Sequence, residues 1–431
     1  MAVLSGFKAI KNYISFRNFI ILSPIFFLTV QHWTSAVVVV ASAGALIFIA
    51  KNKQGASTGH WKWAAAMALG APLMAVLVGQ LLRGTLYFPN MDAPLRLALC
   101  VPILWAVSKG WLNQPGSKPV SMVWIERVIP LTLLWTFFFR LNWPTAWDVD
   151  LTTYFVDPLT FGSYCLLFSM VALVGISFNW SSSTWILRFL GICSVLCGVY
   201  LSLTSGSRTG WINLPIFITI WSVFFLKPRW GGQATLKVAA IALLGLGILV
   251  FREDYLVEKF ALAVREIQTY NWDSVNDDTS VGLRISFYRM GYYYFMTRPF
   301  QGWGDLGWTA LMNNPEFQVY ASEFARLSPK HGFHNEIITS AVRSGLWGLA
   351  ASVFFYVYFL LQGIKGFITV STEVGKVLSF VLLIFMTHLV VMGMTTEITN
   401  LIFLSSFIGL TLAVLLGEVS RENGVDKARH L

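Results

Sequence analysis

The sequence predicts an all-α protein that crosses a membrane many times. Hydrophobic residues make up 56% of the chain and charged residues only 12%, about half the ~25% charge of an ordinary soluble domain. Apolar runs recur from "FIILSPIFFLTV" near the N-terminus to "LIFLSSFIGLTLAVLL" near the C-terminus, and many are long enough to span the hydrocarbon core as helices. Trp and Tyr stand at many run ends, where an amphipathic ring suits the headgroup layer.

We expect about twelve transmembrane helices. They are predicted at 19–31, 34–50, 62–82, 94–108, 126–142, 158–178, 184–204, 210–226, 234–251, 343–362, 376–396 and 399–417. The fourth is the weakest of these, because it is short and contains Pro102. The basic start of the chain leads directly into the first apolar run without a visible cleavage site, which favours a retained signal anchor.

Basic residues set the expected orientation. With the N-terminus inside, the inner connections hold most of the lysines and arginines, including Lys8, Lys11, Arg17, Lys51, Lys53, Lys62, Lys109, Lys118, Lys227, Arg229, Lys365, Lys376 and Arg421. Positive residues are retained on the cytoplasmic side, so both termini are predicted to be cytoplasmic. This topology accounts for the net charge of +10, and no nucleic-acid partner is needed to explain it.

One long connection, 252–334, separates the ninth and tenth spans and falls outside the cytoplasm. It divides the chain into spans one to nine (1–251), this loop, spans ten to twelve (335–417) and a short tail (418–431). "YLVEKFALAVREIQ" has apolar residues at helical spacing, and "RISFYRMGYYYFMT" predicts a second, aromatic helix. A connection of this length with its own patterning is usually functional.

Metal or disulfide chemistry is poorly supported. All four cysteines lie inside apolar runs, which is typical of packing. The acidic patterns "DVD" at 148–150 and "DD" at 277–278 are weak signals for a cation, and His331 and His334 lack a further ligand at zincin spacing. We therefore expect no metal and no other cofactor.

Three arginines on the outer face are candidates for binding an anion. Arg208 lies in "SGSRTG", whose small residues would let a phosphate approach both backbone and guanidinium. Arg284 and Tyr288 share a face of the aromatic helix, whereas Arg289 points elsewhere. The alternatives are an interface arginine that reaches toward water and a solvated helix face.

The segment "HGFHNEIITSAVRSGLWG" gathers polar groups at one membrane edge. We expect His334 to start a helix that runs into the tenth span, with Gly345 and Gly348 forming a close packing face. A histidine at the water boundary, with an ordinary pKa near neutrality, suits removal of a proton from a sugar hydroxyl. The alternative is that His331 and His334 are ordinary interface residues.

Taken together, these features resemble the O-antigen ligase family, within the larger group of O-antigen ligases and polymerases. The resemblance rests on the twelve spans with a large periplasmic loop after the ninth, on the two arginine segments, and on "HNEIITSAVRSGLWG". This last segment fits the family's motif of His-Asn, nine residues and Gly-x-x-Gly.

The resemblance implies an inverting, metal-independent membrane glycosyltransferase with a GT-C-like helical fold. It would transfer a finished glycan from undecaprenyl diphosphate to the lipid A core oligosaccharide at the periplasmic face, completing lipopolysaccharide. His334 matches the family's essential histidine, Arg208 the short-loop arginine and Arg284 the large-loop arginine, with Arg289 as a substitute. The supporting candidates are Asn335, Glu336, Tyr288 and His331.

Three alternatives remain open. An O-antigen polymerase would use the same donor with a second lipid-linked glycan, and a protein O-oligosaccharyltransferase would glycosylate Ser or Thr. A flippase or transporter is less favoured, because the sequence shows no internal repeat and its ionisable residues gather at one face.

Overall fold

The computed structural model describes residues 16–52, 60–113, 116–142, 155–206, 209–225, 253–276, 278–305 and 307–429. Within these ranges the regular elements are helical. They are α2 (Phe16–Ile21), α3 (Trp33–Lys51), α4 (His60–Arg83), η1 (Phe88–Met91), α5 (Asp92–Ala98), α6 (Cys100–Ser108), α7 (Val120–Val123), η2 (Trp124–Val128), α8 (Ile129–Asn142), α9 (Pro158–Asn179), α10 (Trp185–Thr204), η4 (Thr209–Ile212), α11 (Asn213–Phe225), α13 (Glu253–Thr269), α14 (Ser280–Thr297), η6 (Gly307–Leu311), α15 (Pro315–Gln318), α16 (Glu323–Leu327), η7 (Ser328–His331), α17 (Glu336–Ser344), α18 (Leu346–Thr369), α19 (Glu373–Gly393) and α20 (Ile402–Arg429).

The many apolar helices confirm the prediction of a polytopic membrane protein. In the described part of the chain, nine helical segments are long and apolar enough to cross a membrane. They correspond to predicted spans two to seven and ten to twelve. The eighth span is represented by the 13-residue helix α11, and the ninth, 234–251, lies outside the described residues. The total of twelve spans and the GT-C-like arrangement therefore stay predictions.

The first predicted span differs from expectation. After the six-residue helix α2, residues 22–32 form successive turns instead of a continuous helix. The backbone there bonds three residues back, as in Ser23 N to Ile20 O at 3.1 Å and Phe27 N to Pro24 O at 3.2 Å. Pro24 explains the change, because proline has no N–H and its ring clashes with the preceding helical turn.

An aromatic cluster forms part of the bundle core. Phe27, from the turn segment, stacks on Phe407 of α20 with ring centroids 4.0 Å apart. Tyr164 of α9 meets Phe27 edge to face at 5.0 Å. These rings are almost fully buried, and edge-to-face pairs of this kind add to the free energy gained from burial alone. The turn segment is thus fixed against α9 and α20.

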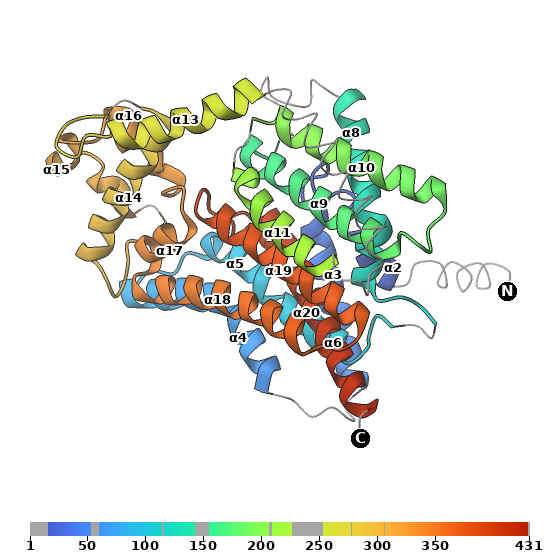
Figure 1. Ribbon diagram of the computed structural model, residues 1–431. Helices are drawn as coiled ribbons and strands as arrows, with labels where there is room; N and C mark the ends of the chain where they lie inside the picture. Colours follow the sequence, from blue (N-terminus) through green and yellow to red (C-terminus); the bar gives the residue numbers. More distant parts are fainter. Residues whose placement is uncertain are drawn as a thin grey trace.

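The long connection folds into a lobe beside the bundle. Figure 1 shows α13, α14, α15 and α16 gathered at one end of the molecule, in yellow and orange, next to α17. Both helices predicted in this loop are confirmed, as α13 and α14. Phe287, Tyr294, Trp308, Phe317 and Phe333 are buried within the lobe and build its core.

A break separates α17 from α18, which contradicts the expectation of one helix continuing into the tenth span. Gly345 stands between them with φ 64° and ψ −146°, a conformation that side chains with a Cβ rarely adopt. Its Cα also lies against the backbone of Pro299 and Phe300. Gly345 and Gly348 therefore do not share a helix face, and Gly348 instead packs on the carbonyl of Ser340.

Gly198 of α10 provides a test of this packing. A Cβ there would collide with the Ser169 hydroxyl and would lie 2.9 Å from the Cys165 carbonyl of α9. We expect Gly198→Ala to lower the midpoint of thermal unfolding in detergent, because overpacking typically costs about 1–3 kcal/mol.

The matched control is Gly70→Ala in α4, where a Cβ would meet nothing within 4 Å. This change should leave the midpoint unchanged or raise it, since alanine favours a helix over glycine by about 1 kcal/mol. Equal midpoints for the two variants would contradict the close contact of α9 and α10.

Candidate active site

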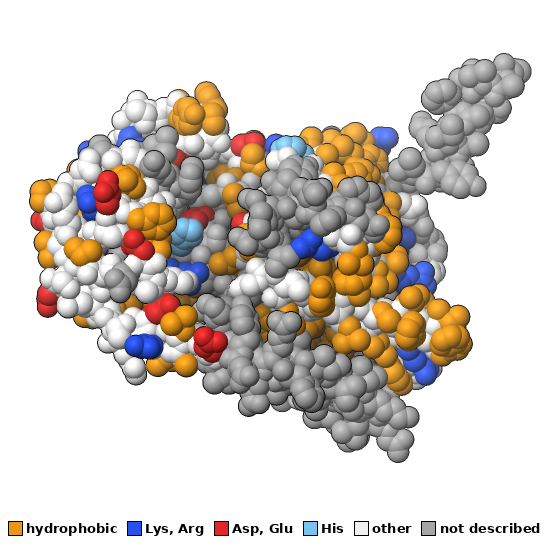
Figure 2. All heavy atoms as spheres, turned by 90° about the horizontal axis from the view of Figure 1, so that it is seen from above, with side chains coloured by type: hydrophobic (Ala, Val, Ile, Leu, Met, Phe, Trp, Pro, Cys, Tyr) orange, Lys and Arg blue, Asp and Glu red, His pale blue; other side chains and the backbone are white. Residues whose placement is uncertain are grey.

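His334 lies at the junction between the lobe and the helical bundle. Its side chain is exposed, and its backbone has φ 49°, in the left-handed region that non-glycine residues seldom occupy. The imidazole stacks on Phe287 of α14, with ring centroids 5.4 Å apart and planes 21° apart. Figure 2 shows a hollow between lobe and bundle where histidine, acidic and basic side chains gather. Such strained backbone is often found at functional sites.

Asn335 begins the helix that follows the histidine. Its backbone is extended and its Oδ1 accepts hydrogen bonds from Ile337 N at 3.0 Å and Ile338 N at 3.1 Å. This is an N-cap, which satisfies backbone donors that a helix start would leave unpaired. The supporting residue Asn335 thus fixes where α17 starts and where His334 stands relative to it.

Glu336 is buried behind the histidine, with only 1% of its surface exposed. Its carboxylate accepts a hydrogen bond from Thr399 N at 3.0 Å, another from the Thr399 hydroxyl, and a third from Ser340 Oγ at 3.1 Å. The charge sits in the first turn of α17, where the helix dipole favours an anion. Glu336 therefore ties α17 to the segment that leads into α20, and its oxygens point away from solvent.

Glu397, in the connection between α19 and α20, is the second acidic residue that holds the backbone around His334 in place. Its carboxylate accepts a hydrogen bond from Thr339 Oγ1 at 2.9 Å and another from the backbone N–H of His334. Thr339 Oγ1 in turn accepts from Phe333 N at 2.9 Å. Gly332 leaves space for this carboxylate, because a Cβ at that position would overlap it.

Burial raises the pKa of Glu397 to about 7, although the Thr339 hydroxyl works in the opposite direction. Glu397 falls between the last two predicted spans, 376–396 and 399–417, and was not among the candidate site residues. One signal could have singled it out: it is the only acidic residue between the last two apolar runs, and acidic groups at a membrane edge are candidates for function.

The structure separates the two arginines of α14. Arg284 acts electrostatically on His334. Arg289 instead donates to Trp272 O at 3.0 Å, and its guanidinium lies over the Tyr320 ring at 3.6 Å. It is held inside the lobe by these contacts. Of the two, Arg284 is the one placed to act beside the histidine.

Tyr288 connects the lobe to the bundle. Its hydroxyl donates to Met394 O, just after α19, at 2.7 Å. The bond aligns α14 with the connection that carries Glu397. Tyr288 thus helps to position the site through the backbone of that connection.

His334 reaches the surface, but partial withdrawal from water still lowers the pKa of its imidazole, and the nearby positive charge of Arg284 lowers it further. Asp157, which caps α9 by accepting from Thr160 N at 2.9 Å, raises it and so opposes both effects. The lowered pKa favours the neutral imidazole, which has a free nitrogen lone pair able to accept a proton. A neutral imidazole beside a guanidinium is an arrangement that can activate a hydroxyl next to an anion.

Some predicted groups cannot be placed. Arg208 and the side chain of His331 lie outside what the structure describes, as do the acidic residues 148–150 and Asp277. Among the described residues no three His, Cys, Asp or Glu side chains form a possible metal-binding group. The absence of a metal requirement stays a prediction.

The titration of His334 can be tested by NMR on histidine-labelled protein. Arg284→Gln removes a positive neighbour, so the pKa of His334 should rise. Asp157→Asn removes the negative neighbour and keeps a side chain that caps helices equally well, so the pKa should fall further. Arg289→Gln should leave it unchanged. Shifts in the opposite directions would show that these groups do not face the imidazole.

Two comparisons relate this chain to known proteins. An uncharacterised protein of Haemophilus influenzae is 26% identical over 185 residues, which cover 42% of this chain and 45% of that protein. The chain thus matches less than half of that relative's length. The model of the O-antigen ligase family matches residues 192–353, a stretch that includes Arg208, Arg284 and His334. Over residues 192–353 the match agrees with the resemblance to the O-antigen ligase family seen in the sequence.

Proposed function

We propose that this protein is an O-antigen ligase that transfers a glycan from undecaprenyl diphosphate to the lipid A core oligosaccharide. The family match indicates a glycosyltransferase-like membrane enzyme with ligase- or polymerase-like activity on a lipid-linked glycan. The observation that carries the proposal is the position of the His334 imidazole, which stacks on Phe287 of α14, the helix that also carries Arg284.

In this mechanism His334 takes the proton of the acceptor hydroxyl. The hydroxyl oxygen attacks the anomeric carbon of the glycan, and the bond from that carbon to the diphosphate oxygen breaks. The bond electrons leave with the diphosphate, and attack from the opposite side inverts the anomeric centre. The imidazole is suited to this step because its pKa lies below its ordinary value, so the base is available at neutral pH.

The leaving diphosphate needs positive charge near the membrane boundary. Arg284 of α14 would supply one guanidinium, and Arg208 would supply the second from the short connection after α10. Guanidinium groups bind phosphate oxygens in a two-pronged manner, and fixed cations are effective where charge develops in a transition state. Transfer would then require neither a metal nor a nucleotide.

The proposed orientation follows from the basic residues of the inner connections. Both termini would lie in the cytoplasm and His334 would face the periplasm, where a glycan already flipped across the inner membrane is accessible. Glu397 and Glu336 act in this scheme as positioning residues, because their carboxylates hold the backbone on both sides of the histidine.

Substitution of the three proposed groups is the direct test. His334→Ala, Arg208→Ala and Arg284→Ala should each reduce glycan transfer by roughly a hundredfold or more, the range expected for a general base or a charge-stabilising donor. The measurement uses purified protein, undecaprenyl-diphosphate-linked glycan and lipid A core, with membrane insertion checked separately.

Arg289→Ala is the matched control, because it removes a guanidinium of the same helix that contacts Trp272 and Tyr320 in the lobe, and it should retain transfer. Near-normal rates for His334→Ala and Arg208→Ala would refute the site. Product formed only when a second lipid-linked glycan replaces the lipid A core would identify a polymerase, and absence of any product would favour a transporter.

Metal independence has its own test. EDTA should leave the transfer rate of the purified protein unchanged, because arginines are proposed to neutralise the diphosphate. Loss of activity that magnesium restores would return the acidic residues at 148–150 or 277–278 to consideration as ligands.

A further inference from the structure

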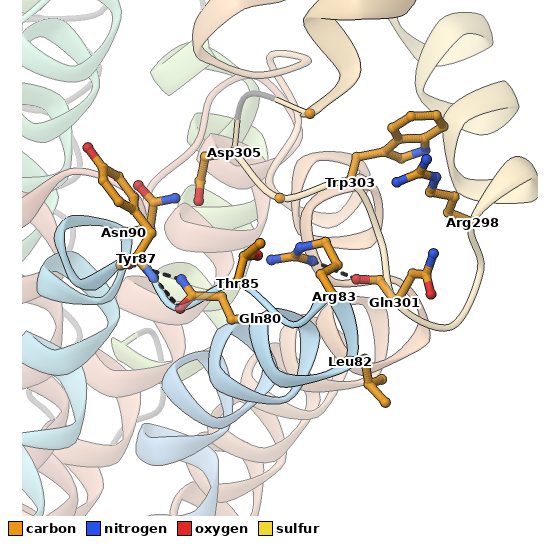
Figure 3. Close-up of a pocket in the computed structure, with 12 residues that line it drawn as sticks. Gln80, Leu82, Arg83, Thr85, Tyr87, Asn90, Arg298, Gln301, Trp303 and Asp305 are labelled. Carbon is orange, nitrogen blue, oxygen red and sulfur yellow. Dashed lines mark hydrogen bonds between the residues drawn. The ribbon is translucent and has the colours of Figure 1, made fainter.

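A second cavity lies at the opposite end of α17 from His334. It has a volume of about 690 Å³, within the range of small-molecule sites. Figure 3 shows its two walls: the end of α4 with the turn that follows it, and the loop after α14. Glu336 and Arg343 lie near opposite ends of α17, about 10 Å apart along a helix axis. The cavity is therefore separate from the histidine site.

The second wall is fixed to the end of α17. Trp303 N and Gly304 N donate to Val342 O at 2.8 Å and Arg343 O at 2.9 Å. Arg83 Nη1 donates to Gln301 O at 2.6 Å and to Arg343 O at 2.9 Å. Gly304 has φ 77° and leaves room for this guanidinium to lie flat against it. Arg83 is thus held in place by neutral carbonyl groups.

Positive charge is in excess around this cavity. Asp305 attracts the guanidinium of Arg83, whereas Arg343 and Arg298 both repel it. Among the described residues that line the cavity, only Asp305 is acidic, and it already forms an ion pair with Arg343. Arg298 lies over the Trp303 ring at 3.9 Å, and the described residues show no carboxylate paired with it. Like charges gathered in this way repel one another, and an anion would relieve that repulsion.

Neutral polar groups complete the walls. Gln80 is occupied, because its amide exchanges hydrogen bonds with the backbone of Tyr87 at 3.0 and 2.9 Å. Gln80 therefore stabilises the turn after α4, which forms the first of the two walls. Asn90, Thr85 and Gln301 add further polar side chains to the lining. Amides and hydroxyls beside guanidinium groups suit a sugar that carries phosphate.

The surroundings of the cavity indicate a lipid. Arg83 is the last residue of a segment apolar enough to cross a membrane. Large apolar side chains are exposed around it, with Leu82 51%, Leu86 58% and Phe88 73% exposed. Such side chains are stable when acyl chains cover them. The cavity thus opens where a headgroup would sit above its own hydrocarbon tails.

We propose that this cavity binds the phosphorylated sugar headgroup of a membrane glycolipid, through Arg83, Arg298 and Asn90. The inference rests on the proposed function in one respect, because it takes the bound lipid to be the acceptor of the transferred glycan. The lipid would be anchored at one end of α17 while its glycan extends toward His334 at the other.

Binding is measured first, without catalysis, on full-length protein in nanodiscs. The probes are phosphorylated lipid A core, the same glycolipid after phosphatase treatment, and inorganic phosphate. Arg298→Gln should weaken binding of the phosphorylated lipid roughly ten- to hundredfold, as expected for loss of a charged hydrogen bond. Asn90→Asp, which adds a carboxylate without changing size, should do the same.

Arg265→Gln is the matched control, because Arg265 lies exposed on α13 outside the cavity. This variant should bind the phosphorylated lipid as tightly as the unmodified protein does. Dephosphorylated lipid should bind the unmodified protein as weakly as phosphorylated lipid binds Arg298→Gln. Equal binding of both lipids, or no effect of Arg298→Gln and Asn90→Asp, would overturn the proposal. Competition by inorganic phosphate as strong as that by the lipid would show a free-anion site instead.

The transfer assay separates this inference from the proposed function. Arg298→Gln should raise the KM for the acceptor and leave the KM for the donor and the kcat unchanged. Tight lipid binding that depends on Arg298, without any transfer by the unmodified protein, would refute the function alone. Normal transfer by both cavity variants, with an unchanged acceptor KM, would refute the cavity assignment alone.

Discussion

Glu336 joins α17, the helix that follows His334, to the connection that leads into α20. Its carboxylate is withdrawn from water and bonded to Thr399 and Ser340, so removing a partner would leave a buried charge uncompensated, at a cost of several kcal/mol. Glu397 makes a parallel connection through Thr339. Together these acids join α17 to the connection between α19 and α20. The left-handed backbone of His334 is maintained because residues on both sides of it are fixed.

The lobe supplies the other half of the site. Its aromatic core places α14 so that Phe287 lies against the imidazole, while Tyr288 reaches the bundle at Met394. The proposed reaction on a lipid-bound donor needs a surface that meets both membrane and water. Here the bundle provides the membrane-embedded part, and the lobe closes one side of the hollow above it.

Much of the fold could be predicted because burial in lipid requires continuous apolar helices. The sequence alone located α3, α4, α9, α10, α18, α19 and α20, and also α13 and α14 in the loop. It did not reveal the turns after α2, where Pro24 interrupts an apolar run that otherwise resembles a span. Nor did it reveal the break at Gly345, since a glycine inside an apolar pattern is compatible with helix until its φ is known.

The site was predictable only in part. The positions of His334 and Arg284 follow from local sequence and family resemblance, but the separate environments of Arg284 and Arg289 depend on Trp272 and Tyr320, which are distant in the chain. Glu397 lies 63 residues after His334, and their contact arises only from tertiary packing. Arg208 falls outside the described residues, so its role still rests on sequence.

The interruption at Gly345 has a mechanical consequence. A helix running without a break from the bilayer to the histidine would act as a rigid lever, and any tilt that accommodates a thicker or thinner membrane would displace its outer end. In this protein the chain changes direction at Gly345, where it is clamped against Pro299 and Phe300. The position of α17 is set by its contacts with the lobe and with the connection between α19 and α20. The alignment of α17 therefore does not depend on the lipid composition around α18.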